Sequence, residues 1–296
     1  MPRALAIINP KSGTSSKANI IQQLNEAFLQ SNYTLYFSYT RCAGHAYELA
    51  RQAVLDGYAR VVAVGGDGTV NEVARALRHT GVSLAIIPMG SGNGLARALG
   101  LPMNVGQASA IAAGGVEELI DCCQANEEPF FCTCGMGFDA EVSAAFAEAP
   151  FRGFLSYAKT SIEHYIKYRP ELYTIEIEGE DTIQTEAFVV AAANASQYGN
   201  NAHIAPRASM QDGKVDIVVL RPFNVLNLPQ ITLQLFSKKL EENAHQSSYQ
   251  ASRATFIRSH AGIVHLDGEP MEMPERIEIS VLPSSIRVVR ADNSLC

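Results

Sequence analysis

The first third of the chain alternates between two hydrophobic patterns. Short apolar runs of strand length take turns with longer stretches of helical periodicity, in the order 4–8, 17–30, 35–39, 44–56, 61–64, 70–79, 84–87 and 92–99. This rhythm is typical of strand–helix–strand units on a parallel sheet, as in doubly wound folds. The first part of the chain therefore predicts an α/β domain, and its ligands are expected in the loops that follow the strands.

The pattern changes near residue 121. Strand-like runs with turn signals between them then follow one another, at 130–134, 172–177, 187–193, 215–220, 254–257, 263–266, 277–281 and 286–289. Helical stretches at 154–167 and 225–241 interrupt them. Such a succession predicts a mostly antiparallel β-sandwich domain. We expect two domains, 1–121 and 122–296, in which the last strand is able to return to the first domain.

Length and composition are consistent with this division. A chain of 296 residues suits two domains better than one. No apolar run approaches the roughly 18 residues of a membrane-spanning helix. The first residues lack the features of a signal peptide, so we expect a cytoplasmic protein. The net charge of −7 argues against a nucleic acid partner and provides no polybasic membrane anchor.

Cysteines and histidines show no metal-binding or redox spacing. The six cysteines form no C-x-x-C pair. Cys132 and Cys134 alternate with Thr133 in an apolar run, which predicts buried strand thiols. The histidines, among them His265, are interpreted as structural or surface residues.

The loop after the run at 61–64 carries the clearest chemical signal. It reads Gly65-Gly66-Asp67-Gly68-Thr69 and opens a helical stretch. Glycines bring backbone N–H groups close to phosphate oxygens, and a helix N-terminus favours an anion. An acid in such a loop needs a purpose, such as holding Mg²⁺ or accepting a proton. The alternative is a tight turn in which Asp67 or Thr69 caps the helix.

Two other loops at strand ends are rich in small polar residues. The segment 9–13, Asn-Pro-Lys-Ser-Gly, is similar to a phosphate loop but lacks the spacing of a Walker motif. The segment 88–94, Pro-Met-Gly-Ser-Gly-Asn-Gly, includes Ser91 and Asn93, which are able to cap a helix or bind phosphate. We expect the three loops to converge on one edge of the sheet.

These loops resemble those of the diacylglycerol kinase catalytic family, which includes bacterial lipid kinases and sphingosine kinases. The Gly-Gly-Asp-Gly-Thr run alone is shared with NAD kinases, so the ordered set of motifs is what makes the resemblance specific. Besides the three loops, the set runs nearly end to end and comprises Thr40 with Gly44-His45-Ala46, Glu72, Gly135-Met136-Gly137-Phe138-Asp139-Ala140, Asp212-Gly213 and Leu266-Asp267-Gly268-Glu269.

The resemblance implies that the first domain binds ATP with Mg²⁺. Asp67 is implied to be a catalytic or metal-coordinating acid. The residues implied to line the nucleotide site are Asn9, Ser12, Gly13, Thr40, Gly65, Gly66, Asp67, Gly68, Thr69, Gly90 and Ser91.

In the second domain the resemblance implies that Asp267 and Glu269 are catalytic acids that supply the proton acceptor, a role that coupled acids are able to share. Asp139 is implied to contact the lipid head group. The alternatives are that Asp267 and Gly268 form only a hairpin turn and that Asp139 caps a helix.

A structural Mg²⁺ site is implied at Asp212, with backbone carbonyls near Ser209 and Lys214. Oxygen ligands of this kind suit a hard cation. The alternative is that Asp212 and Gly213 form only a hairpin turn.

The resemblance predicts a lipid kinase that transfers the γ-phosphate of Mg·ATP to a hydroxyl of a diacylglycerol- or sphingosine-like lipid. The form Ser91-Gly92-Asn93 is that of sphingosine kinases, which favours a single-chain amphiphile. An NAD kinase-like soluble kinase and a non-catalytic nucleotide-binding regulator stay open as alternatives. The membrane lipid places the expected enzyme at the bilayer surface, peripheral to the membrane, and a homodimer stays open.

Overall fold

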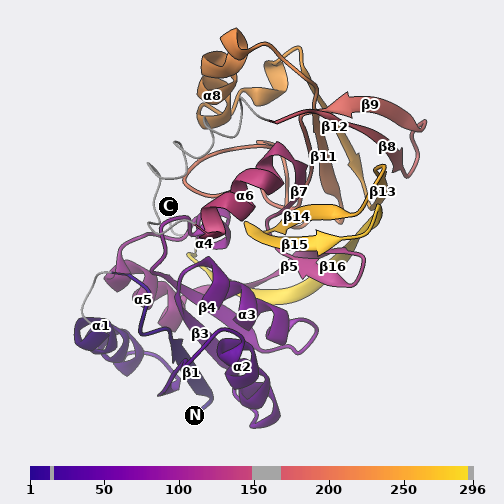
Figure 1. Ribbon diagram of the computed structural model, residues 1–296. Coiled ribbons are helices and arrows are strands. Elements are labelled where there is room, and N and C mark those ends of the chain that lie inside the picture. Colours follow the sequence, from indigo (N-terminus) through magenta and orange to yellow (C-terminus); the bar gives the residue numbers. More distant parts are fainter. Residues whose placement is uncertain (14–16, 149–167, 293–296) are drawn as a thin grey trace. The chain divides into compact units, whose positions relative to one another are not determined.

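The computed structural model describes residues 1–13, 17–148 and 168–292 (Figure 1). The chain divides into two compact units. Unit 1 comprises Met1–Ile120 and Ser284–Cys296, and unit 2 comprises Asp121–Pro283. The helix expected at 154–167 lies outside the described residues.

Unit 1 is an alternation of strands and helices. In chain order its elements are β1 (Arg3–Ile8), α1 (Lys17–Leu29), β2 (Thr34–Tyr39), α2 (His45–Leu55), β3 (Arg60–Gly65), α3 (Asp67–Leu77), β4 (Ser83–Pro88), α4 (Gly94–Ala98), α5 (Val105–Gly114) and the first part of β5 (Val116–Ala125). The strands pair in the order β2-β1-β3-β4, all parallel. The end of β16 (Arg276–Arg290) adds a further parallel strand beside β4, with Arg287 opposite Ser83.

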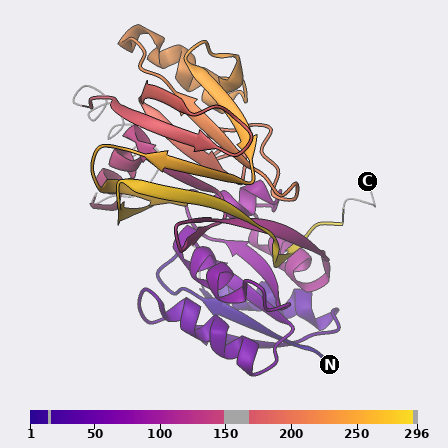
Figure 2. The same ribbon diagram turned by 90° about the vertical axis from the view of Figure 1, so that its right-hand side faces the viewer.

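Helices cover both faces of this parallel sheet. On one face, α1 and α5 pack against side chains such as Ile8, Val62 and Ile87. On the other, α3 contacts β3 and β4, while α2 contacts β1 and α3 (Figure 2). Burial on both sides explains why β1, β3 and β4 read as continuous apolar runs rather than as alternating ones, while the edge strand β2 is partly exposed.

Unit 2 contains mostly strands. Its elements are the second part of β5, β6 (Glu128–Phe130), β7 (Thr133–Gly137), α6 (Phe138–Glu148), β8 (Glu171–Ile177), β9 (Ile183–Ala187), β10 (Val189–Ala193), β11 (Val215–Leu220), the 3₁₀ turn η1 (Val225–Asn227), α8 (Leu228–Phe236), the 3₁₀ turn η2 (Leu240–Glu242), β12 (Gln246–Ala251), β13 (Arg253–Ile257), β14 (Gly262–Leu266), β15 (Glu269–Met273) and the first part of β16.

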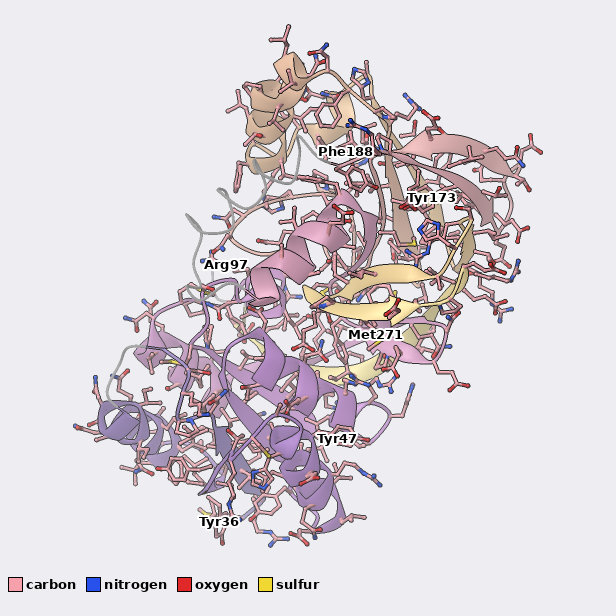
Figure 3. The ribbon with its side chains drawn as sticks, in the orientation of Figure 1. Tyr36, Tyr47, Arg97, Tyr173, Phe188 and Met271 are labelled. Carbon is pink, nitrogen blue, oxygen red and sulfur yellow. The ribbon has the colours of Figure 1, made fainter. Side chains whose placement is uncertain are left out.

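The strands of unit 2 form two antiparallel layers. One sheet has the order β12-β11-β10-β7-β14-β15. The other sheet has the order β16-β13-β8-β9, in which only the first part of β16 belongs to unit 2. Side chains of both layers share one core, in which Phe256 and Tyr173, the latter labelled in Figure 3, are almost fully buried. The predicted fold class, an α/β domain followed by an antiparallel β-sandwich, is confirmed.

Several predicted elements differ from those observed. The run at 130–134 is broken between β6 and β7, because Phe131 and Cys132 donate their amides to a side chain instead of a strand. The runs at 277–281 and 286–289 form the single strand β16. The stretch at 225–241 is η1, α8 and η2 rather than one helix. Helix α5 was not predicted, because its sequence of small residues has little amphipathic contrast.

The prediction of buried strand thiols is confirmed for Cys134 in β7, whereas Cys132 is buried but lies between β6 and β7, outside any strand. Cys132 and Cys134 are buried, and so are Cys122 and Cys123, whereas Cys42 is exposed. Burial raises the pKa of Cys123 and Cys134 well above the usual thiol range, so their thiols stay protonated and unreactive. Among the described helices, none is long and apolar enough to cross a membrane.

Candidate active site

The loops of unit 1 that the sequence singled out meet at the carboxyl ends of the strands. The side-chain amide of Asn9, after β1, donates to Thr69 Oγ1 at 3.0 Å. The amide of Met89, at the end of β4, donates to the carbonyl of Gly65 at 2.8 Å, and the amide of Thr40 donates to the last carbonyl of β1 at 3.0 Å. The predicted convergence of these loops on one edge of the sheet is therefore present.

Glycines allow these loops to touch each other directly. A Cβ on Gly90 would lie 2.8 Å from the Cα of Gly66, so the two backbones are in contact. Gly13 has φ of +70°, and a Cβ there would lie 2.6 Å from the end of the Met89 side chain. Loop-to-loop packing thus requires glycine at Gly90, and the left-handed backbone favours it at Gly13, in addition to any approach of a phosphate.

Helix α3 begins in this cluster without a side-chain cap. Its N-cap residue is Gly66, which has no side chain to accept a hydrogen bond from the first amides of the helix. The backbone amides at the start of a helix have no intrahelical acceptor, and the helix dipole adds partial positive charge there. The amides of Asp67, Gly68 and Thr69 occupy these positions, which are suited to an anion.

The carboxylate of Asp67 binds the start of the next helix rather than its own. Its oxygens accept hydrogen bonds from the amides of Asn93, at 2.9 Å, and Gly94, at 2.6 Å. Asn93 has the left-handed φ of 52°, which asparagine tolerates, and its side chain bonds both the amide and the carbonyl of Gly90 at 2.8 Å. Asp67 therefore fixes the loop 90–94 against the loop 65–69.

Glu72, which the sequence showed only as the last residue of the Gly-Gly-Asp-Gly-Thr-x-x-Glu motif, is a positioning residue. From the second turn of α3, its carboxylate accepts the amides of Gly44, at 2.8 Å, and Ala46, at 2.9 Å. These are two of the amides at the start of α2, so the residue acts as a cap from a neighbouring helix. In the sequence, the spacing Thr-x-x-Glu at the end of the glycine loop was the pattern that pointed to Glu72.

The two serines predicted for the nucleotide site lie at the surface of the same loops. Ser12 is partly buried, and its amide donates to the carbonyl of Asn9 at 3.3 Å. Ser91 is exposed in the loop that precedes α4, close in sequence to Arg97, whose guanidinium donates to Gly92 O at 2.9 Å (Figure 3).

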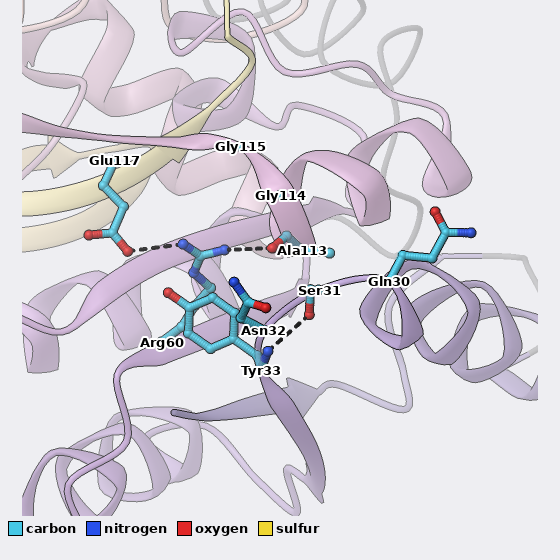
Figure 4. A pocket seen from close by; sticks show the side chains of 9 residues that line it. All are labelled: Gln30, Ser31, Asn32, Tyr33, Arg60, Ala113, Gly114, Gly115 and Glu117. Atoms are coloured by element: carbon cyan, nitrogen blue, oxygen red, sulfur yellow. Dashed lines mark hydrogen bonds and ion pairs between the residues drawn. The ribbon is translucent and has the colours of Figure 1, made fainter. Parts of the chain in front are cut away.

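A separate hollow of about 430 Å³ lies at the opposite edge of the sheet (Figure 4). Arg60, at the beginning of β3, stacks over Tyr33 at 4.4 Å, and both line it. The guanidinium of Arg60 is already committed to Glu117, at 2.9 Å, and to the carbonyl of Ala112, at 2.6 Å. Because the glycine loops follow the carboxyl ends of the strands, this hollow is not the site that they form.

In unit 2, Asp267 and Gly268 form the two-residue turn between β14 and β15, both with positive φ, as a hairpin turn of this length prefers. The carboxylate of Asp267 does more than a turn requires. It accepts the amides of three consecutive residues, at 2.9, 2.7 and 3.0 Å, which are Phe131, Cys132 and Thr133. Burial raises the pKa of this carboxyl, and the three hydrogen bonds only partly offset that effect. Glu269 follows at the exposed start of β15.

Asp139, the predicted head-group contact, is buried at the start of α6. Its Oδ2 accepts the hydroxyl of Tyr198 at 2.9 Å and lies 3.2 Å from His265 Nε2. His265 Nδ1 accepts the amide of Gly268 at 3.3 Å, so Nε2 is the nitrogen that donates to Asp139. His265, interpreted as structural from the sequence, thus joins Asp139 to the turn that carries Asp267.

The proposed metal site lies in the loop before β11. Asp212 Oδ1 accepts the amide of Lys214 at 3.0 Å, and the amide of Gly213 donates to Asp121 Oδ2 at 2.9 Å. Burial raises the pKa of the nearby Asp216, and the charge of Asp212 adds to that effect. Among the described residues no group of three acidic, histidine or cysteine side chains forms a metal cage. A metal at Asp212 stays a prediction, for which this carboxylate and the backbone carbonyls near Ser209 and Lys214 would supply oxygen donors of the kind that a hard cation prefers.

The chain belongs to the family that combines a diacylglycerol kinase catalytic domain, matched at residues 3–125, with a YegS C-terminal NAD kinase beta sandwich-like domain, matched at residues 132–290. Membership of this lipid kinase family makes it a phosphotransferase with an alcohol group as acceptor.

Individual relatives agree with this assignment along the whole chain. The "Diacylglycerol kinase" of Bacillus subtilis (strain 168) is 29% identical and covers 91% of this chain and 90% of its own. The "Probable lipid kinase YegS" of Escherichia coli (strain K12 / DH10B) is 28% identical, with 97% and 95% covered. A crystal structure of a diacylglycerol kinase from Bacillus anthracis str. Sterne, 21% identical, matches the fold with a TM-score of 0.77 over 99% of this chain and 98% of that one.

A metal role of Asp212 predicts a specific loss on mutation. We expect Mg²⁺ to raise the melting temperature of the wild type by several degrees, since each kcal/mol of binding energy adds roughly 2–4 °C in proteins of this size. Asp212→Ala is expected to abolish this response. Asp181→Ala, which removes an exposed aspartate from another turn of unit 2, serves as the control. If Asp212→Ala responds to Mg²⁺ as the wild type does, Asp212 is only a turn residue.

Proposed function

We propose that the protein transfers the γ-phosphate of Mg·ATP to a hydroxyl of a diacylglycerol- or sphingosine-like lipid. The observation that carries this proposal is the uncapped start of α3 within the cluster of glycine loops. It offers consecutive backbone amides and a helix dipole to an anion, and a triphosphate is the anion that this family uses.

The residues of unit 1 have defined tasks in this proposal. The amides of Gly68 and Thr69 bind phosphate oxygens, while Asn9 orients the Thr69 hydroxyl through their 3.0 Å hydrogen bond. Asp67 holds the loop 90–94 through Asn93 and Gly94, and its carboxylate oxygens retain lone pairs that are able to bind a metal ion. Bound Mg²⁺ would neutralise charge on the transferring phosphoryl group.

Proton transfer is assigned to unit 2. Asp267 is a suitable acceptor because burial raises the pKa of its carboxyl, which increases its affinity for the hydroxyl proton. The lipid oxygen then forms a bond to the γ-phosphorus as the bond from that phosphorus to ADP breaks. The products are a phosphorylated lipid and ADP, and the proton resides on the acid. Glu269, exposed beside the turn, is the second candidate for this task.

Transfer of labelled phosphate tests the proposal directly. The protein is incubated with γ-labelled ATP, Mg²⁺ and, in separate reactions, sphingosine, monoacylglycerol, diacylglycerol and NAD, with the lipids in matched detergent micelles. We expect a labelled lipid, with a single-chain amphiphile phosphorylated at least as well as diacylglycerol. Labelled NADP without any labelled lipid would establish the NAD kinase alternative, and ATP binding without transfer to any acceptor would establish the non-catalytic one.

The same assay tests Asp139 as a substrate contact. Asp139→Asn is expected to lower kcat/KM for sphingosine more than for diacylglycerol, because an ammonium pairs with a carboxylate through charge-assisted hydrogen bonds. Tyr198→Phe is the matched control, since it removes one partner of Asp139 but leaves the carboxylate. A clear preference for diacylglycerol that the mutation leaves unchanged would contradict this assignment.

Asp67→Asn is expected to lower kcat by at least ~100-fold, since a proton acceptor or metal ligand contributes about that much. The amide also replaces one of the two acceptor oxygens that hold Asn93 and Gly94, so a small fall in melting temperature accompanies the loss. Asp56→Asn, at the exposed end of α2, is the control. Near wild-type turnover of Asp67→Asn would remove Asp67 from the chemistry.

Two substitutions of His265 separate its two contacts. Asparagine places an acceptor near the position of Nδ1 and keeps the bond from Gly268, whereas glutamine reaches the position of Nε2 and keeps the bond to Asp139. If His265 positions the catalytic turn, His265→Gln is expected to lose about tenfold more kcat than His265→Asn at similar melting temperatures. Equal losses of kcat in both variants would show that the residue only stabilises the core.

A further inference from the structure

Exposed apolar side chains occur close together in sequence on and just before helix α8 of unit 2, which is the orange helix labelled in Figure 1. Val225, Leu226, Leu233 and Phe236 are all exposed, with Leu226 at 84% and Leu233 at 69%. We call these four residues the α8 patch. Elsewhere in the described part of unit 2, the large apolar side chains that are exposed, Leu172 and Ile263, lie apart on different strands.

The fold uses only one face of this helix. Ile231 is buried in a cluster with Leu240, and Leu235 packs against the same cluster. At 3.6 residues per turn, Leu233 and Phe236 lie on the side of α8 roughly opposite to Ile231. Helix α8 is therefore apolar on both sides, and within the described part of unit 2 its outward Leu233 stays 69% exposed.

The α8 patch is held in a fixed conformation. The side chain of Asn224 accepts the amide of Leu226 at 3.0 Å and so caps η1 at the tip. On the inner side, the carbonyl of Leu235 accepts the amide of His203 at 2.9 Å. Asn243 donates to the side chain of Gln234 at 2.7 Å. The exposed leucines therefore lie on a 3₁₀ turn and a helix that are held by hydrogen bonds within unit 2.

The charges around the patch select its partner. The chain carries a net charge of −7, yet residues 217–240 contain no aspartate or glutamate. Lys238 and Lys239 are exposed directly after α8. Glu241, the first acid that follows, is paired with Arg207 at 2.7 Å, and Glu242 is exposed. Apolar side chains beside two lysines suit a surface that has hydrocarbon beneath anionic head groups.

We propose that the α8 patch docks unit 2 on an anionic lipid bilayer, with the leucines inserted at the boundary between head groups and acyl chains and the lysines on the head groups. This rests on the proposed function, because a lipid acceptor resides in such a bilayer. A protein that takes its acceptor from a membrane gains a high local concentration of substrate when it is held at that surface.

Co-sedimentation with vesicles tests the docking without any need for activity. Vesicles of phosphatidylcholine alone and with a third of phosphatidylglycerol are compared, with the full chain as wild type, L226Q/L233Q and K238E/K239E. L172Q is the matched control, since Leu172 is 62% exposed on β8 of the same unit. We expect L226Q/L233Q to bind anionic vesicles at least ~10-fold more weakly, because each leucine loses its apolar burial. K238E/K239E is expected to lose the preference for phosphatidylglycerol, and L172Q to bind as the wild type.

Two further measurements separate this proposal from the proposed function. Stabilisation by Mg·ATP in a melting experiment is expected to be the same in L226Q/L233Q and wild type, which shows that the variant is folded. Phosphorylation of a lipid in detergent micelles reports on the kinase itself. If wild type does not bind anionic vesicles, or if L226Q/L233Q and L172Q bind alike, the docking proposal fails whatever the kinase result. A wild-type dimer that L226Q/L233Q converts to a monomer, without vesicle binding, would instead assign the patch to a second copy of the chain.

Discussion

The close contact between Gly66 and Gly90 is the constraint on which the candidate site of unit 1 depends. Any side chain at Gly90 would meet the Gly66 backbone at 2.8 Å and push the two loops apart. Their separation would carry Asp67 away from the amides of Asn93 and Gly94. The start of α4 would then lose the carboxylate that binds it. The parallel sheet brings the loops to one edge, but only glycine lets them close on each other there.

Carboxylates that bind two or three backbone amides of one short segment recur in both units. Asp67 does so at the start of α4, Glu72 at the start of α2, and Asp267 at the residues between β6 and β7. Backbone amides at such places have no partner in regular structure, and hydrogen bonds to a charged acceptor are worth about 1.5–3 kcal/mol each. An acid in one of these motifs therefore contributes to the geometry of its loop before it contributes to any chemistry.

The sequence predicted the fold better than it predicted these contacts. Buried parallel strands leave continuous apolar runs, so the alternation in unit 1 and the change to strands near residue 121 were readable. Helix α5 was not, because its small residues are apolar without a clear face. The break at Phe131 and Cys132 depends on Asp267, more than a hundred residues away, and no local pattern reports such a pairing. Glu72 was visible as part of a motif, but its partners Gly44 and Ala46 are on another helix. The predicted roles of the site residues in catalysis stay predictions.

Two opposing effects act on the carboxyl of Asp267, the proposed proton acceptor. Its three amide donors favour the ionised carboxylate and fix its orientation, and the nearby His265 lowers its pKa further. Burial acts in the opposite direction and prevails, so the pKa is raised. With amides alone, the carboxylate would be well placed but a weak base. With burial alone, it would be a stronger base but free to rotate. Because the same turn supplies both, the position of Asp267 and its proton affinity cannot be changed independently, and the contact of Gly268 with His265 links both to the buried Asp139.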